Sequence, residues 1–471
     1  MTTSSSTQTR AAHFADINPA TGEKLADISV ATAAEVTQAV AAAQEASAAW
    51  RALDLDARCE LLAQVAAGIA DHADEFADLI TREMGKPRAE ALKEAEGYAA
   101  HALEILAEVK LALAPQAFES RAADTVLVRE AHGVVAAITP WNFPVGMPVT
   151  ILFPALATGN TVVFKPSEHV PLCGALLARL FQKALPQGVL ALIQGAGDVG
   201  AQLVAAEVDM IGFVGSRATG QHIMASASEG LKRLVLELGG KDPLIVFEDA
   251  DLDAAAECVA RHSLRNTGQV CCSIERVYVA ESIAADFEER VVEQARQWTH
   301  GDGFDESVRM GPMVSGEQRA KVSVQVDGAV RDGARLLLGG HEDAGDGFFY
   351  PATVLAGVQT EMQLSSDETF GPVVSLTTFS GDEQEAIRLA NDTPYGLGAN
   401  VWTADRERGQ RVARGLRAGQ VGVNRYLTAG SGTPWVGARQ SGFGFLGGIE
   451  GHRQFTVPKT ISTAIPASSG A

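Results

Sequence analysis

Two adjacent cysteines follow a polar, glycine-containing turn in the run Asn266-Thr267-Gly268-Gln269-Val270-Cys271-Cys272. A cysteine attacks a carbonyl carbon as the thiolate, so a nucleophilic cysteine needs access and nearby dipoles that lower its pKa. The turn before Cys271 could provide such dipoles. Both thiols could equally be small core side chains, which is the commoner environment of cysteine. These residues by themselves leave a catalytic and a structural thiol open.

Two further polar residues have surroundings that suit catalysis. Glu237 ends an apolar stretch that begins at Leu234 and is followed by Leu238-Gly239-Gly240. A carboxylate at an apolar edge can have a raised pKa and act as a general base, although a solvated carboxylate at a strand end is the alternative. Asn142 lies in the rigid segment Pro140-Trp141-Asn142-Phe143-Pro144. Its side-chain amide could donate to a developing oxyanion, or it could occupy a proline-fixed turn.

Two glycine loops could bind the phosphates of a dinucleotide. Gly195-Ala196-Gly197-Asp198-Val199-Gly200 has the spacing G-x-G-x-x-G, but Asp209 comes too early to be the acidic residue expected about 20 positions later. In Gly215-Ser216-Arg217-Ala218-Thr219-Gly220, the Ser216 hydroxyl and the amides of a following helix could hold a pyrophosphate. Either loop could also be an ordinary strand-to-helix turn, so spacing alone does not choose between them.

The first quarter of the chain is predicted to be mostly helix. Thr32 and Glu35 form a capping box before an Ala-rich stretch that ends near Trp50. Helical pattern returns over Arg58–Glu83 and Arg88–Leu113.

Strands and helices then alternate between residues 133 and 250, which predicts parallel βαβ units. A second α/β stretch runs from about Leu244 to Val423, and it includes a helix over Ala284–Trp298 and a strand over Val373–Phe379. The earlier predicted strands are Thr125–Arg129, Gly133–Ile138, Thr161–Phe164, Gly188–Ile193 and Met210–Val214, and the predicted helices are Cys173–Leu185, Ala201–Ala206 and Gly220–Ser228.

Composition excludes several classes of protein. The chain has 471 residues, of which 46% are hydrophobic and 20% charged, as in soluble globular proteins. A formal net charge of −20 argues against a nucleic-acid partner, which needs clustered basic side chains. Five cysteines without zinc-site spacing predict no metal, reduced thiols and a cytoplasmic location. Met1–Arg10 predicts a short disordered tail, and no apolar run is long enough to span a membrane.

Together, these segments resemble the aldehyde dehydrogenase superfamily over nearly the whole chain. Any one of them could occur by chance, whereas six in the family's order and spacing are specific. The segments are Pro140-Trp141-Asn142-Phe143-Pro144, Lys165-Pro166-Ser167-Glu168, Phe213-Val214-Gly215-Ser216, Glu237-Leu238-Gly239-Gly240, Asn266-Thr267-Gly268-Gln269-Val270-Cys271 and Glu368-Thr369-Phe370-Gly371-Pro372.

The resemblance implies the catalytic roles. The family's nucleophile lies two residues after the Gln, which is Cys271 rather than Cys272. The general base falls on Glu237, and Asn142 with the backbone amide of Cys271 holds the oxyanion. The implied reaction is attack of the thiolate on a small-molecule aldehyde, hydride transfer from the thiohemiacetal to NAD, and hydrolysis of the thioester by a water that Glu237 activates.

The resemblance also implies where the cofactor binds. The phosphate loop falls on Gly215-Ser216, which leaves the loop at Gly195 without that role. Because a carboxylate accepts hydrogen bonds from ribose hydroxyls and repels a 2′-phosphate, Glu168 predicts NAD rather than NADP. The implied cofactor-binding residues are Ile138, Thr139, Trp141, Gly215 and Ser216, with Lys165 and Glu168 at the adenine ribose, Glu368 at the nicotinamide ribose and Phe370 beside the ring.

The implied architecture is an α/β aldehyde dehydrogenase fold with three units. Residues 1–115 and 133–238, with about 442–455, would form a Rossmann-like NAD-binding domain, and residues 239–441 an α/β catalytic domain. Residues 116–132 and 456–471 would form a β-strand oligomerisation extension. An isolated arm exposes strand edges, so a homodimer or homotetramer is expected.

Two features depart from or refine the resemblance. Many members read Gly-Arg-Glu where this chain has Gly444-Phe445-Leu446, so a Glu that assists the base in some members is absent. Arg265 lies six residues before Cys271, where succinate-semialdehyde dehydrogenases hold the distal carboxylate of the substrate, but the second Arg of that pattern is Thr150 here. Arg265 is therefore a candidate substrate residue, with a structural or surface arginine as the alternative.

Three other functions would use the same fold or thiol. CoA could accept the acyl group, but CoA-acylating members typically lack the Glu at the position of Glu237. A thiol hydrolase would use Cys271 without a redox step, but no His adjoins the motif. A non-catalytic protein would not need Cys271, Glu237 and Asn142 together. The sequence thus predicts NAD-dependent oxidation of an aldehyde to its acid.

Overall fold

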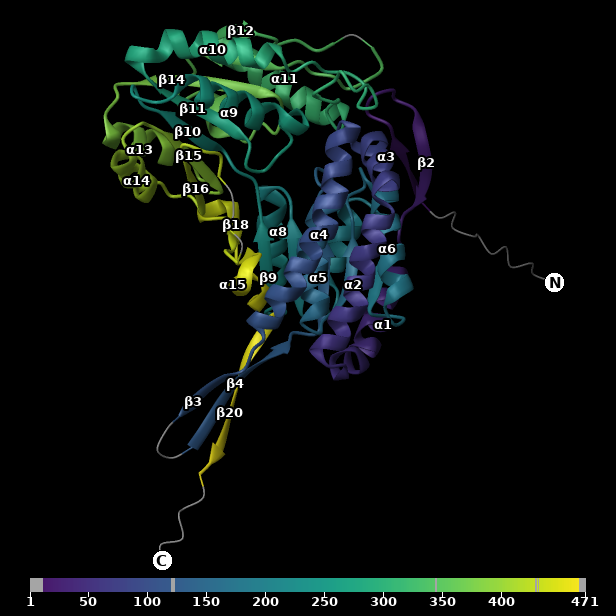
Figure 1. The fold of residues 1–471 in the computed structure, drawn as a ribbon. Coiled ribbons are helices and arrows are strands. Elements are labelled where there is room, and N and C mark those ends of the chain that lie inside the picture. The colour runs from purple at the N-terminus through teal and green to yellow at the C-terminus, as the bar shows by residue number, and fades with distance from the viewer. Residues whose placement is uncertain (1–11, 120–122, 344, 428–429, 431, 466–471) are drawn as a thin grey trace, which may run out of the picture.

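The computed structural model describes residues 12–119, 123–343, 345–427, 430 and 432–465. It has two lobes, each built on a mainly parallel sheet, and a three-stranded sheet that projects away from both (Figure 1). The predicted α/β class is confirmed. The predicted tail at residues 1–10 and the last part of the predicted extension, residues 466–471, lie outside the described residues.

The first lobe is built on six strands: β5 (Val134–Ile138), β6 (Thr161–Lys165), β7 (Leu190–Leu192), β8 (Met210–Val214), β9 (Arg233–Glu237) and β18 (Gly442–Phe443). Their order is β18-β9-β8-β5-β6-β7, and only β18 runs antiparallel to its neighbour. The chain fills one side of β5 first and then returns to the other side with β8. Ligands of such sheets bind beyond the carboxyl ends of the strands at this reversal.

Helices cover both faces of the sheet, and they are α1 (Ala33–Ala52), α2 (Leu55–Asp71), α3 (Ala73–Met84), α4 (Arg88–Ala112), α5 (Gly146–Ala157), α6 (Pro171–Ala184), α7 (Gly197–Ala205) and α8 (Arg217–Ala227). In β5, Val135 and Ala137 join the core with α2 to α6, whereas Val134, Ala136 and Ile138 join the core with α1, α7 and α8. Burial on both faces explains why β5 is a continuous apolar run.

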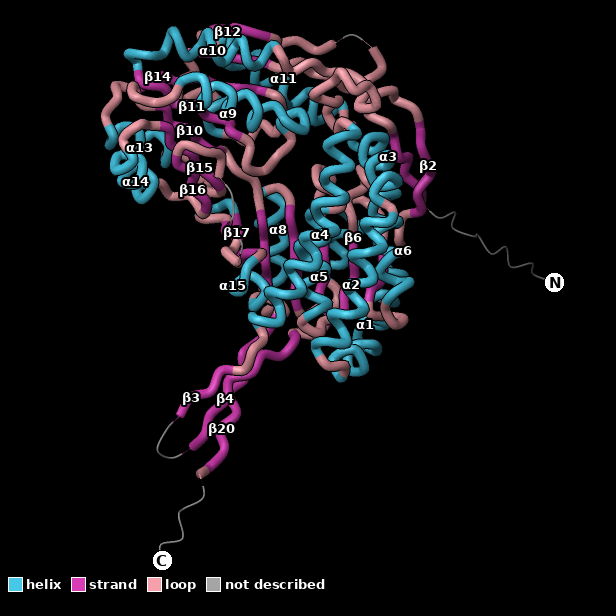
Figure 2. The backbone as a smooth tube through the Cα atoms, viewed as in Figure 1, coloured by secondary structure: helices cyan, strands magenta, loops and turns pink. Residues whose placement is uncertain are grey.

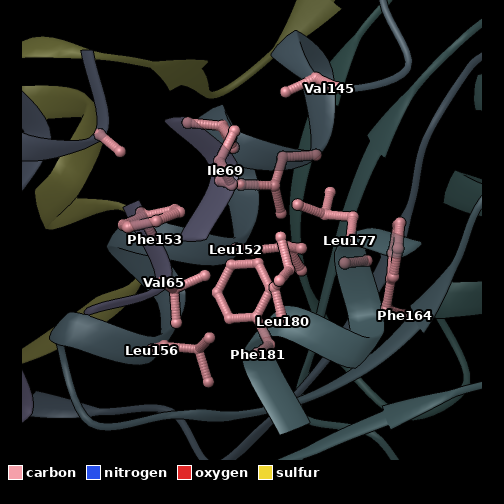
Figure 3. Packing of buried hydrophobic residues seen from close by; sticks show 14 of the residues in the cluster. Val65, Ile69, Val145, Leu152, Phe153, Leu156, Phe164, Leu177, Leu180 and Phe181 are labelled. Atoms are coloured by element: carbon pink, nitrogen blue, oxygen red, sulfur yellow. The ribbon is translucent and has the colours of Figure 1, made fainter. Parts of the chain in front are cut away.

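The packing of α5 fixes the segment that leads into it. Figure 3 shows Leu152, Phe153 and Leu156 of α5 among side chains of α2 and α6. The rings of Phe153 and Phe181 meet edge to face, with centroids 5.3 Å apart. A helix anchored in this way gives the Pro140–Pro144 segment a rigid attachment at its carboxyl end.

The second lobe is built on seven strands: β10 (Asp242–Val246), β11 (Ile274–Ala280), β12 (Arg335–Leu338), β13 (Thr353–Ala356), β14 (Val373–Phe379), β15 (Gly398–Trp402) and β16 (Gln420–Val423). Their order is β12-β13-β14-β11-β10-β15-β16, and only β12 is antiparallel. The helices are α9 (Leu252–Leu264), α10 (Ala284–Arg296), α11 (Gly316–Arg331), α12 (Gln363–Ser366), α13 (Glu383–Asn391) and α14 (Arg406–Gly415), with short 3-10 turns η1 (Arg265–Gly268), η2 (Glu281–Ile283) and η3 (Arg439–Ser441).

The remaining elements link and extend the lobes. A short pair, β17 (Trp435–Val436) and β19 (Phe445–Leu446), precedes α15 (Gly448–Arg453). The projecting sheet of Figure 2 has the order β20-β4-β3 and consists of β3 (Gln116–Glu119), β4 (Ala123–Ala131) and β20 (Thr456–Ala464). Each outer strand of this sheet has an edge with no strand partner among the described residues. Within the described part of the chain, no helix has the length and apolar character needed to cross a membrane.

The sequence patterns of the first quarter are confirmed only in part. The capping box of Thr32 and Glu35 is present, and it begins α1. The single helix predicted over Arg58–Glu83 is wrong, because the backbone at His72 (φ −108°, ψ 18°) leaves helical geometry and separates α2 from α3. The hairpin of β1 (His13–Ile17) and β2 (Lys24–Ser29) has no counterpart among the predicted elements.

Candidate active site

The turn before the two cysteines has an unusual backbone. Asn266, Thr267 and Gly268 are consecutive left-handed residues, with φ of 50°, 57° and 69°. This conformation costs a residue that has a side chain roughly 1–2 kcal/mol, so it persists only where its surroundings hold it. A Cβ at position 268 would lie 2.0 Å from the carbonyl oxygen of Gly371, so only glycine fits there.

Side-chain amides of the same run hold this turn. Asn266 Nδ2 donates to the carbonyl oxygens of Asn142 and Gln269, both at 3.2 Å. Gln269 Nε2 donates to the carbonyl oxygen of Asn266 at 3.2 Å, and its Oε1 accepts from the amide of Val314 at 2.9 Å. The polar residues before Cys271 therefore shape the backbone, and that backbone places the thiol.

The two cysteines have different surroundings. Cys271 is half-buried and lines a cavity, whereas Cys272 is 6% exposed and its Sγ lies 3.1 Å from the Tyr426 hydroxyl. The hydrogen bond between the thiols, together with burial, raises the pKa of Cys271. The same hydrogen bond, aided by the nearby positive charge of Arg265, lowers the pKa of Cys272 to about 6.

Charge and access thus point to different cysteines. The hydrogen bond between the thiols and the positive charge of Arg265 lower the pKa of Cys272, whereas the pKa of Cys271 is raised. The attacking sulfur must nevertheless reach the substrate, and Cys272 is buried against Tyr426. Cys271 is therefore the more accessible of the two thiols to a molecule in the cavity.

Asn142 is held close to the nucleophile turn. Its side chain is 4% exposed, and its Nδ2 donates to the carbonyl oxygen of Gln269 at 3.0 Å. An amide nitrogen carries two hydrogens, so one contact leaves a second for an oxyanion. The backbone carbonyl oxygen of Asn142 accepts from Lys86 Nζ at 2.8 Å.

A buried ion pair that no motif marks supports this segment. Lys86 pairs with Glu94, and the other oxygen of Glu94 accepts from the amides of Val145 and Gly146 at 3.0 Å and 3.1 Å. Those amides begin α5, where a negative charge is favourable. Lys86 and Glu94 thus fix the strand-to-helix segment that carries Asn142.

Glu237 ends β9 and is almost fully buried. It is 4% exposed, and neither carboxylate oxygen has a hydrogen-bond partner among the described residues. Burial raises the pKa of Glu237 well above its usual range. The nearby backbone amide of Leu446 opposes this shift, although its geometry falls outside that of a hydrogen bond. The ionised form of such a carboxyl group can take a proton from water.

The predicted catalytic side chains meet at one cavity of about 170 Å³ between the lobes. Cys271, Glu237 and Asn142 all line it. Gln318 and Lys321 of α11 line it as well, and sequence analysis did not mark them. The sequence offers one indication of these two residues, their spacing of three positions, which places both on one face of a helix.

The turn before β14 contributes the far wall of this cavity. Glu368 and Phe370 line it, and Glu368 Oε1 accepts from the amide of Gly240 at 3.2 Å. A Cβ at Gly239 would lie 2.3 Å from the Glu368 carboxylate, so the two glycines after Glu237 allow this close approach. The rings of Phe370 and Trp141 meet edge to face at 5.5 Å.

A second cavity of about 510 Å³ adjoins the first, since Trp141 and Gly215 line both. It lies beyond the carboxyl ends of β5 and β8, where the strand order of the first sheet reverses. All nine residues predicted to bind a cofactor line one of the two cavities: Ile138, Thr139, Trp141, Lys165, Glu168 and Gly215 the larger one, and Ser216, Glu368 and Phe370 the smaller one.

Both glycine loops lead into the larger cavity. Ser216 is the N-cap of α8, and its Oγ accepts from the amide of Thr219 at 3.2 Å. Gly197 and Gly200 of α7 line the same cavity, so the helix after the first loop forms another of its walls. Spacing alone does not show this, because the loops follow β7 and β8, which are consecutive in the sequence but are separated in the sheet by β5 and β6.

Lys165 and Glu168 lie at one end of the larger cavity. Their charged groups are 3.7 Å apart, and Lys165 Nζ donates to the carbonyl oxygen of Pro166 at 3.1 Å. Burial lowers the pKa of Lys165, whereas the Glu168 side chain keeps 36% of its exposure. The Oε2 of Glu168 also accepts from the Ser167 hydroxyl at 3.4 Å, and the partly exposed carboxylate can accept further hydrogen bonds from a ligand.

Arg265 lies beside the cysteines rather than in the lining of either cavity. Its guanidinium is 5.7 Å from the centre of the Tyr426 ring, and the Tyr426 hydroxyl contacts Cys272. The Nε of Arg265 is buried without a hydrogen-bond partner in the described part of the chain. No described carboxylate forms an ion pair with this arginine.

Comparison with known proteins gives the same result from sequence and from structure. The sequence model of the aldehyde dehydrogenase family matches residues 5–461 of this chain. A probable succinate-semialdehyde dehydrogenase (NADP+) of Sinorhizobium fredii is 38% identical over 454 residues, which are 95% of this chain and 92% of that protein. A betaine aldehyde dehydrogenase of Brucella melitensis is 39% identical over 451 residues, which are 94% of this chain and 92% of that protein.

Solved structures agree over the same span. Betaine aldehyde dehydrogenase from Staphylococcus aureus in complex with NAD+ superposes with a TM-score of 0.92 and 34% identity, over 96% of this chain and 91% of that one. Lactaldehyde dehydrogenase from Escherichia coli superposes with a TM-score of 0.94 and 33% identity, over 97% of this chain and 96% of that one. The similarity therefore covers both lobes and the projecting sheet.

Proposed function

This chain belongs to the aldehyde dehydrogenase family, and we propose that it oxidises an aldehyde to the corresponding acid, with NAD as the acceptor. One observation carries the proposal. A half-exposed thiol, a buried carboxyl group and a side-chain amide line one cavity, and that cavity adjoins a larger one at the reversal of a parallel sheet.

The larger cavity fits a dinucleotide. Its volume of about 510 Å³ is within the range of ligand sites. The N-terminus of α8 opens beside it, where backbone amides can hold a pyrophosphate. When bound there, NAD would supply the acceptor for the hydride of the aldehyde carbon.

The chain's own residues account for the acylation half of the reaction. The Cys272 thiolate takes the proton of the Cys271 thiol, and the Cys271 thiolate so formed attacks the carbonyl carbon. The free hydrogen of the Asn142 amide and the backbone amide of Cys271 stabilise the oxyanion. The closed surroundings strengthen both contacts, because the local dielectric is low.

Glu237 accounts for the deacylation half. It takes a proton from a water molecule in the shared cavity, and that water attacks the thioester carbon. The raised pKa of Glu237 suits this role, since a more basic carboxylate accepts a proton from water more readily. The presence of this carboxyl group favours hydrolysis over transfer of the acyl group to CoA.

Arg265 supports a substrate that carries a carboxylate. A buried guanidinium nitrogen without a protein partner is costly, and a bidentate carboxylate would satisfy it. The same charge would repel a quaternary ammonium group. The arginine therefore favours the substrate named for the Sinorhizobium fredii relative over the one named for the Brucella melitensis relative.

Glu168 supports NAD over NADP. Its partly exposed carboxylate can accept from ribose hydroxyls, and a 2′-phosphate near it would meet a like charge. We expect kcat/KM to be higher with NAD, measured by NADH and NADPH absorbance at equal cofactor concentrations. A higher value with NADP would contradict this role.

The proposal is tested by mixing the protein and NAD, without CoA, with succinate semialdehyde, butanal or betaine aldehyde and following NADH absorbance. We expect the highest kcat/KM with succinate semialdehyde and no NADH from Cys271→Ala. Failure to form NADH from any aldehyde, with or without CoA or NADP, would contradict the oxidative function and favour a thiol hydrolase.

The role of Arg265 has its own variant. Arg265→Gln should lower kcat/KM for succinate semialdehyde by on the order of 10²-fold, because a charge-assisted contact is lost, and should change that for butanal little. Arg261→Gln is the matched control, since Arg261 is exposed in the last turn of α9, the helix that ends just before Arg265. Equal losses for both aldehydes would give Arg265 a structural role.

We also propose the division of the chain into units. Residues 442–455 belong with the NAD-binding unit, supported by the pairing of β18 with β9, and residues 239–441 form the catalytic unit. Residues 116–132 and 456–471 form the extension, supported by β3, β4 and β20, and its free edges support a homodimer or homotetramer. Five free cysteines support a cytoplasmic location.

A further inference from the structure

The turn that carries Glu368 and Phe370 has a strained backbone. Phe370 has a φ of 54°, which is rare for an aromatic residue and costs roughly 1–2 kcal/mol. The turn projects two side chains into the smaller cavity, so its conformation decides where both of them lie. A strained turn of this kind persists only where surrounding groups hold it.

One buried carboxylate holds the amides of this turn. Glu275 Oε2 accepts from the amide of Thr369 at 2.8 Å, and Glu275 Oε1 accepts from the amide of Phe370 at 2.9 Å. Glu275 is 4% exposed and lies at the start of β11, four residues after Cys271. The two oxygens of one side chain thus match two successive amides.

A buried lysine completes the arrangement. Lys241 Nζ donates to Glu275 Oε2 at 2.6 Å and to Thr369 Oγ1 at 3.0 Å. Thr369 Oγ1 in turn donates to Gln325 Oε1 at 2.8 Å. Lys241 adjoins Gly240, whose amide donates to the Glu368 carboxylate. The charge of Glu275 is therefore paired where water cannot reach it.

The carbonyl side of the turn is held from α11. Gln318 Nε2 donates to the carbonyl oxygens of Thr369 and Phe370 at 3.1 Å and 3.0 Å. These contacts leave the turn little freedom once the amides are bound. The Thr369 carbonyl and the Phe370 amide belong to one planar peptide group, so Gln318 and Glu275 hold that group from its two sides, and Glu275 also holds the amide of Thr369.

We propose that Glu275 is a positioning residue for the cofactor end of the site. Its carboxylate, neutralised by Lys241, fixes the Thr369–Phe370 backbone and so places Glu368 and Phe370 against the nicotinamide ribose and ring. The proposal rests on the proposed function, because that function assigns the cofactor to Glu368 and Phe370. It adds that β11, the strand that follows Cys271, also sets the geometry of the cofactor turn.

The chemistry of the contact requires a carboxylate. A glutamine of the same shape offers one acceptor and one donor, so one of the two amides would face another donor. It would also leave the buried Lys241 charge unpaired, which is destabilising by itself. A positioning role and a stabilising role therefore need separate variants.

Glu275→Gln tests the pairing and the positioning together, and Lys241→Met/Glu275→Gln removes the unpaired charge. We expect the single variant to unfold at a lower temperature than wild type and the double variant to regain part of that loss. Both should bind NAD at least 10-fold more weakly by calorimetry. Glu288→Gln, at the Glu288–Arg335 ion pair, is the matched control and should bind NAD as wild type does.

Hydrogen exchange supplies a readout that needs no cofactor. The amides of Thr369 and Phe370 should lose protection in both Glu275 variants, while iodoacetamide should alkylate Cys271 at a rate within about twofold of wild type. Folded variants with wild-type NAD affinity and protected amides would overturn the positioning role alone. Wild-type protein that does not bind NAD would overturn the proposed function and this inference with it.

Discussion

Cys271 and Cys272 share a hydrogen bond, so their ionisation is a property of the pair. The contact holds the proton on Cys271 and the negative charge on Cys272, beside the Tyr426 hydroxyl and Arg265. The thiol of Cys271 therefore ionises less readily while Cys272 is beside it. This arrangement depends on the residue after the nucleophile, which can be tested by removing that thiol.

Cys272→Ala should lower the pKa of Cys271, because it removes the hydrogen bond that makes the largest contribution to raising it. The pH at which iodoacetamide alkylates Cys271 at half its maximal rate should fall relative to wild type. The measurement is the alkylation rate from pH 6 to pH 10, followed by mass spectrometry. A midpoint that stays in place or rises would show that burial, rather than Cys272, controls Cys271.

Asn142→Ala should lower kcat by on the order of 10²–10³, the usual effect of losing one oxyanion donor. The loss should be mainly catalytic, because the Lys86 contact uses the backbone of Asn142 and Gln269 keeps a second donor in Asn266. NADH absorbance gives kcat, and thermal unfolding gives the control. An unchanged kcat would exclude the amide from the oxyanion site.

Glu237 should give the reaction its dependence on pH. Its pKa is raised by burial, and only the ionised form accepts a proton, so thioester hydrolysis should accelerate as pH rises through that pKa. Glu237→Gln should remove this rise and let an acyl-enzyme accumulate, measured by rapid mixing and intact-mass spectrometry from pH 6 to pH 9. A wild-type rate without dependence on pH would contradict the role.

At the scale of elements, buried polar contacts fix the ends of helices and strands. Lys86 and Glu94 join the start of α4 to the start of α5, and Glu275 joins β11 to the turn before β14. A similar contact fastens the N-terminal hairpin, where Asp16 of β1 meets Glu83 of α3. Glu83 also accepts from the amides of Leu172 and Cys173 at the start of α6.

Asp16 should make the protein less stable as pH rises. Burial raises the pKa of Asp16 to about 6 and, with the charge of Asp16, raises that of Glu83 further above its usual range. The folded protein therefore keeps protons that the unfolded chain releases from about pH 4 upward. The free energy of unfolding should decrease through pH 6 and beyond, since the unfolded state binds fewer protons.

Asp16→Asn tests this linkage. It removes one of the two acids and keeps a donor for Glu83, so the variant should be more stable than wild type at pH 8, by on the order of 1–3 kcal/mol. At pH 4 the difference should nearly vanish. Thermal unfolding at both pH values measures this, and a variant less stable than wild type at pH 8 would contradict it.

At the scale of the whole molecule, the site exists because two lobes meet. The first lobe supplies Asn142 and Glu237 and the second supplies Cys271, Glu368 and Phe370, and all five line one cavity. The projecting sheet takes no part in that cavity. Its exposed apolar side chains include Phe118 and Ile461, which are 55% and 48% exposed.

The projecting sheet should hold the oligomer together. Val457→Asp/Ile461→Asp should give a particle with the mass of one chain in size-exclusion chromatography with light scattering, because both exposed side chains lie on one face of β20 and the change places charge in the apolar part of the expected interface. Ser462→Asp is the control, as it lies on the same strand with its side chain on the other face. An oligomer that survives the double change would place the interface elsewhere.

The sequence by itself, through the resemblance that its motifs carry, predicted the class of enzyme and most elements. Short motifs identified Cys271, Glu237 and Asn142 as candidates. Each motif is a contiguous segment, and the glycine, proline or amide residues that shape its backbone lie within it. Buried strands such as β14 were predicted with their observed ends, since an apolar run between turn residues has few alternatives. The helical pattern did not reveal the break at His72, where the backbone leaves helical geometry and separates α2 from α3.

Only the tertiary structure decided which distant residues support those groups. Lys86 lies 56 residues from Asn142, and Lys241 lies 128 residues from Thr369, so no local pattern relates them. The charge of the thiol pair depends on Tyr426, which is 154 residues from Cys272. Such contacts depend on the order of the strands and the packing of the helices. A local sequence pattern predicts neither of these.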